Sequence, residues 1–275
     1  MQLASIVLSF FSLIAPGLAS AADCVVRAPG GLVKAGKLTI ATDPTAPPHA
    51  FFDEDRMVGF AVEIGQAMGR QMCLEAEFVP VAFAGLFAGL NAHEVDAIIA
   101  AVVITPERRQ SFDFVPYFQD GARLVVPKNS KLWFESETDL CGRKVATQTG
   151  SSEAISLERA NREACPAGKK IAVMAYPNFN EAVRQLRKKG AEVAFIDWPF
   201  ANYLAQMAPD LALGSPILSD APGRPRNKQG LVVRKGDSET ATTLADALGR
   251  VQANGEYEKI LAKWNLSDGD IRRDQ

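Results

Sequence analysis

The sequence predicts an α/β fold, because short β-rich runs alternate with segments of helical periodicity. Residues 37–43 form a β-rich run, apolar positions recur at helical spacing over 60–68, and a second β-rich run covers 75–81. A helical repeat over 83–90 and the apolar run 95–104 follow. The order strand, helix, strand, helix, strand is typical of α/β proteins. The last run is continuously apolar, which indicates a strand buried in a parallel sheet.

A turn-rich loop follows the first predicted strand. Its residues TDPTAPP include Pro44, Pro47 and Pro48, and these exclude a helix because proline lacks a backbone N–H and fixes φ. Beyond Gly59, the apolar residues repeat at i, i+4, i+7 and i+8. This spacing predicts an amphipathic helix that packs on a sheet.

The second half of the chain repeats this organisation. Residues 142–152 indicate a strand, a turn and a helix start, 179–186 carry a helical apolar face, and 192–197 form a strand. The two halves therefore look like copies of one supersecondary unit. A strand over 230–237 and two helices within 239–264 complete the chain.

The composition indicates a globular protein and argues against several classes of partner. The 275 residues are 47% hydrophobic and 23% charged, with a formal net charge of −2. A core large enough for one or two domains follows. A balanced charge provides no broad attraction for nucleic acid or anionic lipid, so we expect no nucleic-acid partner. Two histidines and four cysteines without zinc-site spacing predict no metal site.

Residues 1–22 have the features of a cleavable secretory signal. They carry no charge, have a Leu/Ile/Phe-rich centre and end in small residues. The apolar stretch 6–18 is shorter than the about 20 residues that span a bilayer. An uncleaved anchor is the alternative, and Asp23 argues against lipid attachment at Cys24. We therefore expect a free, exported chain.

All four cysteines follow the predicted signal. An even number of cysteines in an oxidising compartment suggests two disulfides, and three pairings are possible. Cys141 and Cys165 flank one polar stretch, while Cys24 and Cys73 bracket the first strand and helix. These positions favour the pairs Cys24–Cys73 and Cys141–Cys165, with a role in stability rather than in chemistry.

Several segments together resemble a known family. They are LTIATDPTAPPHAFFDEDRMVGFAVEIGQAM, GLFAGLNAHEVDAIIAAVVITPERRQSFDFVPYFQDGARLVVPKNS, TQTGSSEA and NGEYEKILAKWNL. Their order and spacing resemble those of the extracellular solute-binding proteins of family 3, the polar amino-acid receptors of ABC importers. The resemblance covers nearly all of the chain after residue 22.

The resemblance implies a fold of two α/β lobes joined by two hinge strands, the type II periplasmic binding protein fold, with the ligand between the lobes. Lobe 1 would comprise residues 24–125 and 222–275, and lobe 2 residues 126–221. One hinge would lie in GARLVVPKN.

The resemblance also implies residues that hold the ligand carboxylate. Arg108 stands in ITPERR at the family's carboxylate-binding position, and a guanidinium can bind both oxygens of a carboxylate. Arg109 beside it fits a solvated charge. Ser151 and Ser152 follow Gly150 at a predicted helix N-terminus, where hydroxyl and N–H groups favour an anion. Capping alone would also explain a serine there.

Two aspartates are candidates for the remaining contacts. Asp197 ends the apolar strand EVAFID and matches the family's ammonium-binding aspartate; capping of the next segment is the alternative. Asp43 follows the first strand and either faces the ligand or fixes its own loop, and the loop role is slightly favoured.

The chain departs from the family pattern at the amine end of the site. Ala46 stands where many members carry an aromatic residue, and His49 replaces the following Phe. Val103 stands where many have Ser or Thr, with Ala101 two residues before it. We count Val103, Ala101 and His49 among the ligand-binding positions, with fewer hydroxyl and stacking contacts than usual.

The leading hypothesis is therefore a monomeric periplasmic receptor without cofactor and without enzyme activity. It would capture a small carboxylate-bearing solute, such as an amino acid or derivative, and deliver it to an ABC permease in the inner membrane. One alternative is a dehydratase-like enzyme on the same fold, with His49, Asp43 or Glu153 as the acid or base. Another is an accessory module of a periplasmic dehydrogenase or sensor.

Overall fold

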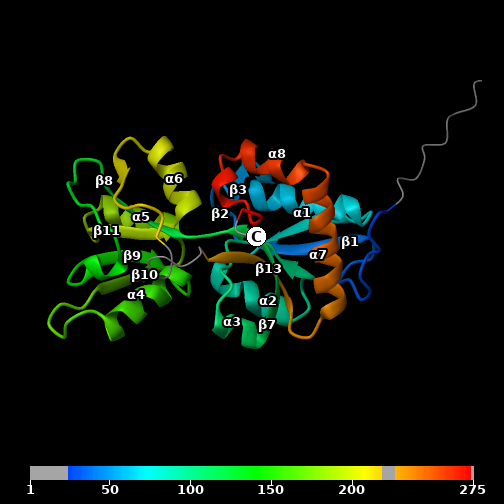
Figure 1. The fold of residues 1–275 in the computed structure, drawn as a ribbon, viewed down its shortest axis with the longest axis horizontal. Coiled ribbons are helices and arrows are strands. Elements are labelled where there is room, and N and C mark those ends of the chain that lie inside the picture. The colour runs from blue at the N-terminus through cyan, green and yellow to red at the C-terminus, as the bar shows by residue number, and fades with distance from the viewer. Residues whose placement is uncertain (1–23, 219–226, 274–275) are drawn as a thin grey trace, which may run out of the picture.

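The computed structural model describes residues 24–218 and 227–273, which form two α/β lobes side by side (Figure 1). The predicted signal segment 1–22 lies outside the described residues, and so does the expected second lobe boundary at 221–222. Among the described residues, no helix combines the length and apolar character needed to span a bilayer.

Lobe 1 is built on a five-stranded sheet in the order β5-β1-β6-β13-β7. Its strands are β1 (Lys37–Thr42), β5 (Glu75–Pro80), β6 (Ala97–Ile98), β7 (Phe112–Gln119) and β13 (Lys228–Arg234). β1 pairs in parallel with β5 and β6, and β13 runs antiparallel to both β6 and β7. A separate three-stranded sheet consists of β2 (Thr45–Ala46), β3 (Ala50–Asp53) and β4 (Arg56–Val58).

Lobe 2 is built on a second five-stranded sheet, in the order β10-β9-β11-β8-β12. Its strands are β8 (Ala122–Pro127), β9 (Lys144–Gln148), β10 (Ala172–Tyr176), β11 (Val193–Asp197) and β12 (Leu211–Leu213). β9 is parallel to β10 and β11, and β8 is antiparallel to β11 and β12. Both sheets thus have three parallel strands followed by an antiparallel one, which confirms the predicted repeat of one supersecondary unit.

Helices cover both faces of each sheet. In lobe 1 they are α1 (Phe60–Gln71), α2 (Leu86–Asn91), α3 (Pro106–Ser111), α7 (Ser238–Ala253) and α8 (Glu256–Lys263), with the 3₁₀ turns η1 (Phe83–Gly85) and η3 (Ser267–Gly269). In lobe 2 they are α4 (Ser152–Glu163), α5 (Phe179–Arg187) and α6 (Trp198–Met207), with the 3₁₀ turn η2 (Glu137–Leu140). The α/β prediction is therefore confirmed.

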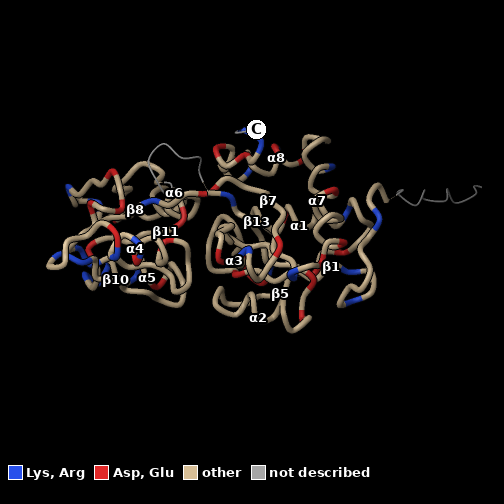
Figure 2. Tube along the Cα trace, turned by 60° about the horizontal axis from the view of Figure 1, so that its bottom comes forward, with Lys and Arg blue, Asp and Glu red and all other residues tan. Residues whose placement is uncertain are grey.

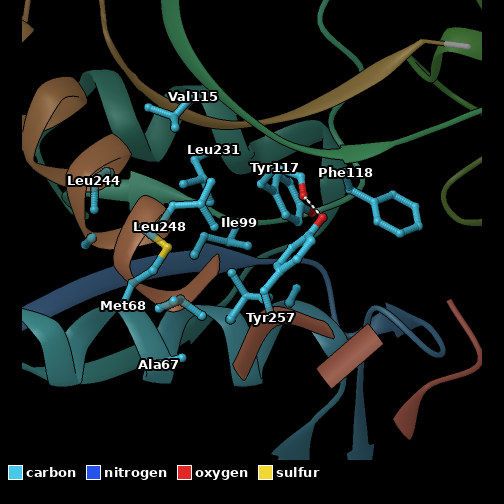
Figure 3. Close-up of a cluster of buried hydrophobic side chains, with 14 of the residues drawn as sticks. Ala67, Met68, Ile99, Val115, Tyr117, Phe118, Leu231, Leu244, Leu248 and Tyr257 are labelled. Atoms are coloured by element: carbon cyan, nitrogen blue, oxygen red, sulfur yellow. Dashed lines mark hydrogen bonds between the residues drawn. The ribbon is translucent and has the colours of Figure 1, made fainter. Parts of the chain in front are cut away.

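The largest core cluster lies between the lobe 1 sheet and α1, α7 and α8 (Figure 3). Its largest members are aromatic, and Tyr257 in α8 donates a hydrogen bond of 2.6 Å to the carbonyl oxygen of Tyr117 in β7. A buried hydroxyl needs such a partner because an unsatisfied one costs free energy. The C-terminal helices are thereby fixed to the sheet that carries the pocket residues described below.

The apolar run 95–104 forms a shorter strand than its composition predicts. Only Ala97 and Ile98 are paired as β6, although the flanking residues are also buried. After β6 the chain turns out of the parallel register: Val102 N bonds to Ala100 O at 2.7 Å, and Val103 forms an isolated bridge with Gln229. The expectation of a strand along the whole run is wrong, because its second half forms buried irregular backbone.

The first crossover between the lobes lies at Asp120 and Gly121. β7 ends in the lobe 1 sheet at Gln119, and β8 pairs with the lobe 2 sheet from Ala122 onward. The boundary expected after residue 125 falls inside β8. We therefore propose that lobe 1 ends at residue 120, five residues earlier than the family resemblance suggests.

Both predicted disulfides are formed. Cys24 is joined to Cys73 and Cys141 to Cys165, each pair with Cα atoms 5.4 Å apart. The first ties the start of the described chain to the end of α1, and the second ties η2 to the end of α4. Charged residues of both signs are interspersed along the chain in the two lobes (Figure 2).

Candidate ligand-binding site

A small pocket lies between the two lobes. Lobe 1 and lobe 2 both contribute to its walls, which are Thr42, Asp43, Ala46, His49, Phe83, Ala100, Ala101, Gln148, Ser151, Ser152, Glu153, Phe179 and Asp197. Several of these residues stand at or just after the carboxyl ends of β1, β6, β9 and β11. Ligands of α/β proteins usually bind at this edge of a sheet.

Asp43 lines the pocket, and protein groups bond to both of its carboxylate oxygens, its own loop to Oδ1 alone. Oδ1 accepts hydrogen bonds from Thr45 N at 3.1 Å and Thr45 Oγ1 at 2.7 Å. Oδ2 accepts from Phe83 N at 3.1 Å and from Gln148 Nε2 of lobe 2 at 3.4 Å. These contacts support the loop-fixing role that the sequence slightly favours.

His49 lies in the lobe 1 wall with its ring buried. Phe60 and Phe118 contact it edge-on, with ring centroids 5.8 and 5.5 Å away. Its position is fixed by the start of α1, because Phe60 N bonds to Pro48 O and Ala61 N to His49 O. Burial lowers the pKa of His49 to about 4, so the ring is neutral near pH 7.

Gly59 makes this arrangement of His49 possible. Its φ is +131°, and a Cβ atom at this position would lie 2.3 Å from the His49 carbonyl oxygen. Only glycine combines this backbone conformation with such a close approach. The His49 side chain therefore depends on a residue that does not itself line the pocket.

Of the two ring nitrogens of His49, Nε2 is hydrogen-bonded, and Nδ1 has no partner among the described residues. His49 Nε2 lies 2.8 Å from Gln229 Oε1, and Tyr117 OH lies 2.9 Å from Ala100 O and 3.2 Å from the same Gln229 oxygen. With Gln229 Oε1 as the acceptor, Nε2 carries the proton and Nδ1 is an acceptor. Among the described residues, neither His49 Nδ1 nor Thr42 Oγ1 has a hydrogen-bond partner, although both atoms are buried in residues that line the pocket.

Arg108 lies beside the pocket rather than in its wall. Its Nη1 donates to Val103 O at 2.7 Å in lobe 1, and its Nη2 donates to Gly150 O at 3.0 Å in lobe 2. The guanidinium also stacks on Phe83 and Phe87, at 5.8 and 5.6 Å from the ring centroids. Burial lowers its pKa, and the acids Glu153 and Asp197 oppose that shift.

Arg109 occupies a different environment. Its guanidinium stacks on Phe114 at 6.0 Å, and the residue is exposed. Neighbouring arginines therefore lie in clearly distinct surroundings, as the motif position predicts.

Ser151 and Ser152 both line the pocket at the start of α4. Ser151 caps the helix, because its Oγ accepts a hydrogen bond from Ala154 N at 3.2 Å. Ser152 Oγ donates to Glu153 Oε2 at 3.3 Å. The left-handed φ of +74° at Gly150 precedes this turn. Capping and pocket lining thus occur together here.

Asp197 shares the lobe 2 wall with Glu153, which the sequence suggested only as the acid or base of the enzyme alternative. Asp197 is 2% exposed and Glu153 is 3% exposed, and their carboxyl groups lie close enough for each to alter the ionisation of the other. Burial raises the pKa of both groups, and for Asp197 the nearby charges of Glu153 and Asp120 raise it further. Asp197 makes no side-chain bond to the N-terminus of α6.

The departures at Val103 and Ala101 have different outcomes. Ala101 lines the pocket, whereas Val103 is buried outside its wall and contributes its carbonyl oxygen to Arg108. Sequence reasoning also missed Thr42, Gln148 and Phe179 as wall residues. Their positions at strand ends or at the start of α5 were the available signal.

The pocket holds no metal-binding arrangement within the described ranges. Residues 24–218 and 227–273 contain no group of three or more His, Cys, Asp or Glu side chains suited to a metal ion.

Comparison with known proteins places this two-lobed architecture among amino-acid-binding proteins. The chain is 27% identical to the L-cystine-binding protein TcyJ of Escherichia coli K12, over 85% of this chain and 84% of that protein. It is 30% identical to the L-arginine-binding protein of Pseudomonas aeruginosa PAO1, over 82% of this chain and 86% of that protein.

Solved structures show the same architecture. An ancestral arginine-binding protein bound to arginine matches with a TM-score of 0.74 and 31% identity, over 83% of this chain and 98% of that one. An ancestral amino-acid-binding protein described as a precursor of cyclohexadienyl dehydratase matches with a TM-score of 0.72 and 27% identity, over 83% and 95%. The fold is thus the two-lobed type II periplasmic binding fold.

The family model of the bacterial extracellular solute-binding proteins, family 3, matches residues 38–267. This range includes both lobes and every residue that lines the pocket. The chain therefore belongs to the bacterial extracellular solute-binding proteins of family 3.

Proposed function

We propose that this chain is the periplasmic receptor of an ABC importer and captures an amino acid or a related small carboxylate in the interlobe pocket. The observation that carries the proposal is the pocket itself, which is enclosed by polar groups from both lobes and contains buried atoms that lack protein partners, Thr42 Oγ1 and His49 Nδ1. Buried polar atoms are normally hydrogen-bonded, so these two support a bound polar molecule.

Arg108 would hold the carboxylate of the solute. Its bonds to Val103 O and Gly150 O use two of the five guanidinium N–H donors, and the remaining donors can bind a carboxylate. Its position over Phe83, which lines the pocket, supports this role. Asp197, in the lobe 2 wall of the pocket, would accept a hydrogen bond from the amine of the solute.

Closure around the solute would then provide the signal for the permease. Residues of both lobes form the pocket wall, so a solute bound there contacts both lobes and favours their closed arrangement. The names of the two curated relatives, which bind L-cystine and L-arginine, support an amino acid as the solute class.

A thermal-shift screen followed by calorimetric titration tests the proposal. Refolded, ligand-free protein is screened with the twenty standard amino acids, ornithine, polyamines and keto acids. A solute at 100 times its dissociation constant stabilises the native state by about 2.7 kcal/mol, which such a screen detects. The absence of any shift with all carboxylated solutes would contradict the proposal.

Titrations of wild type and two arginine variants, each with the acid and with its carboxamide, test whether Arg108 binds the carboxylate. We expect Arg108→Ala to weaken the best amino acid by more than tenfold, because loss of a buried bidentate partner costs about 2 to 5 kcal/mol. Arg109→Ala is the matched control and should change the affinity by less than about 1 kcal/mol. The α-carboxamide of the same amino acid should bind wild type weakly and lose in Arg108→Ala only the roughly two- to tenfold that the interlobe bond to Gly150 contributes.

The same titrations separate the carboxylate role from the interlobe bond of Arg108. If Arg108→Ala weakens the acid and its carboxamide equally, the residue acts only through Gly150 and the carboxylate assignment is wrong. Mass analysis of the bound solute after incubation tests the dehydratase-like alternative, since a receptor returns its solute unchanged.

A further inference from the structure

The lobe 2 wall of the pocket contains two buried acids, Glu153 and Asp197. Glu153 is in the first turn of α4, and Asp197 ends β11, so two separate elements bring these acids into one wall. Both residues are at least nine-tenths buried and both line the pocket. Their carboxyl groups lie close enough for each to alter the ionisation of the other.

Two buried carboxyl groups this close to one another favour a proton on one of them. Two ionised carboxylates have only acceptor atoms, and they repel one another strongly away from water. The hydrogen-bond donors around the pair do not remove this preference. Ser152 donates a hydrogen bond to Glu153 Oε2 at 3.3 Å, and Ser151 and the Glu153 backbone N–H also favour the ionised form of Glu153. These donors are neutral, so they bring no positive charge to the pair.

The charged groups that face the pair add more negative than positive charge. Arg108 on α3 is the cation that acts on both acids, and two of its donors bind the carbonyl oxygens of Val103 and Gly150. Asp120 at the lobe crossover adds a further negative charge near Asp197. Across the pocket, Asp43 binds its own loop and His49 is neutral near pH 7.

We propose that Glu153 and Asp197 act as one binding element, which holds a shared proton in the empty pocket and exchanges it for a positively charged nitrogen of the solute. The exchange replaces the positive charge of the proton by that of the solute nitrogen. Both carboxylates are then ionised, and the bound cation compensates the added negative charge. The displaced proton leaves to solvent. The solute class is therefore a molecule that presents an ammonium or guanidinium group to lobe 2.

This inference rests on the proposed function and extends it, because it makes Glu153 a specificity-determining residue. An aspartate alone would accept an amine without releasing a proton at neutral pH. With the pair, solute affinity is linked to pH. Release of one proton per solute predicts an affinity that rises up to tenfold per pH unit while the pair is protonated in the empty protein.

The first experiment needs no solute. Carboxyl ¹³C NMR of the ligand-free protein at pH 7, with signals assigned through Glu153→Gln and Asp197→Asn, reports whether the pair holds a proton. We expect one protonated carboxyl signal in wild type. Two fully ionised carboxylates at pH 7 overturn the proposal.

The second experiment measures the exchange. Calorimetric titration with the amino acid that gives the largest thermal shift, in phosphate and in Tris at one pH, gives the number of protons released. We expect release of up to one proton for wild type, none for Glu153→Gln, and an affinity of that variant that does not change with pH. Glu158→Gln, an exposed acid on the same helix, is the matched control and should behave as wild type.

The outcomes separate the two proposals. An amino acid that binds wild type tightly without proton release, or with equal release in Glu153→Gln, overturns the exchange and leaves the proposed function standing. A protonated pair in a protein that binds none of the carboxylated solutes of the screen overturns the proposed function, and with it the exchange.

Discussion

The Nε2 atom of the His49 side chain is hydrogen-bonded to Gln229, and among the described residues its buried Nδ1 atom has no partner. The bond to Gln229 Oε1 fixes the ring orientation, and Tyr117 anchors the same region through Ala100. The aromatic rings of Phe60 and Phe118 exclude water from the imidazole. A neutral histidine in such a place offers a solute one acceptor atom, Nδ1, and no charge.

We predict that His49 makes the protein less stable as the pH falls below 6.5. The folded pKa is about 4, below the value of 6.5 for an unfolded histidine, so the unfolded state binds the proton first. The free energy of unfolding should decrease between pH 6.5 and 4 by on the order of 3 kcal/mol from this residue. Below pH 4 this contribution should change no further.

Urea unfolding at pH 7 and pH 4.5 of wild type and His49→Gln measures the effect. The variant should lack this part of the acid destabilisation, whereas His93→Gln, an exposed histidine, should retain it. An equal loss of stability in wild type and His49→Gln between the two pH values would show that His49 is not buried in its neutral form.

Single residues differ in how far the sequence could predict their role. Arg108 and Asp197 carry motif positions, and their roles toward a ligand stay predictions; Asp197 lines the pocket, and Arg108 lies beside it. Glu153 is adjacent to Ser152 in the quoted segment, yet its proximity to Asp197 depends on α4 and β11 meeting in space. The spacing of residues in the sequence cannot predict this proximity, because it arises only when the strands assemble into a sheet.

The Cys141–Cys165 disulfide shows how a single element is fixed. It joins the residue after η2 to the residue after the C-cap of α4, and the sequence separation of the two cysteines is 24. α4 begins with the pocket residues Ser152 and Glu153 and ends near this bridge. The bridge therefore constrains the far end of the helix that carries the lobe 2 wall.

We predict that replacing Cys141 and Cys165 together by serine destabilises the protein by about 3 to 4 kcal/mol, because the unfolded chain regains the entropy of an open loop. Urea unfolding of the purified variant and wild type measures this difference. Solute affinity should stay within twofold of wild type, since neither cysteine lines the pocket. Alkylation of intact wild type without reduction should modify none of its four cysteines.

A large loss of affinity in the double variant would contradict this assignment. It would mean that the bridge positions Ser152 and Glu153 in addition to stabilising the fold.

Elements with strong local patterns were predictable, and those decided by tertiary pairing were not. α1 and α5 follow from apolar spacing, and Phe60, Ile64 and Phe179 are buried as that spacing requires. The run 95–104 has the composition of one long strand, but only Ala97 and Ile98 pair as β6. Its second half instead forms irregular backbone, in which Ala100 and Ala101 line the pocket.

At the scale of the molecule, several hydrogen bonds between described residues join the two lobes beside the pocket. Arg108 donates to Gly150 O, Gln148 donates to Asp43, and Asn180 Nδ2 in α5 donates to Thr45 O in β2 at 2.6 Å. Each bond joins a lobe 1 residue to a lobe 2 residue. The structure is thus a closed arrangement in which protein groups supply part of the interlobe contact.

Asn180 provides a test of this arrangement because it is exposed and does not line the pocket. We predict that Asn180→Ala shifts the ligand-free protein toward an open arrangement. The lost hydrogen bond is worth about 0.5 to 1.5 kcal/mol, which corresponds to roughly a two- to tenfold change in the open-to-closed ratio. The apparent solute affinity should fall by no more than the same factor, since only the closed fraction retains the solute.

Small-angle scattering and calorimetric titration measure both consequences. The ligand-free variant should show a larger radius of gyration than ligand-free wild type, and saturation with the solute from the screen should remove the difference. Asn202→Ala is the matched control, because Asn202 bonds to Arg123 at 2.7 Å within lobe 2 alone and its loss should leave the radius unchanged. If Asn180→Ala and wild type have equal radii and equal affinities, the Asn180–Thr45 contact does not contribute to closure, and the solute contacts in the pocket must account for it.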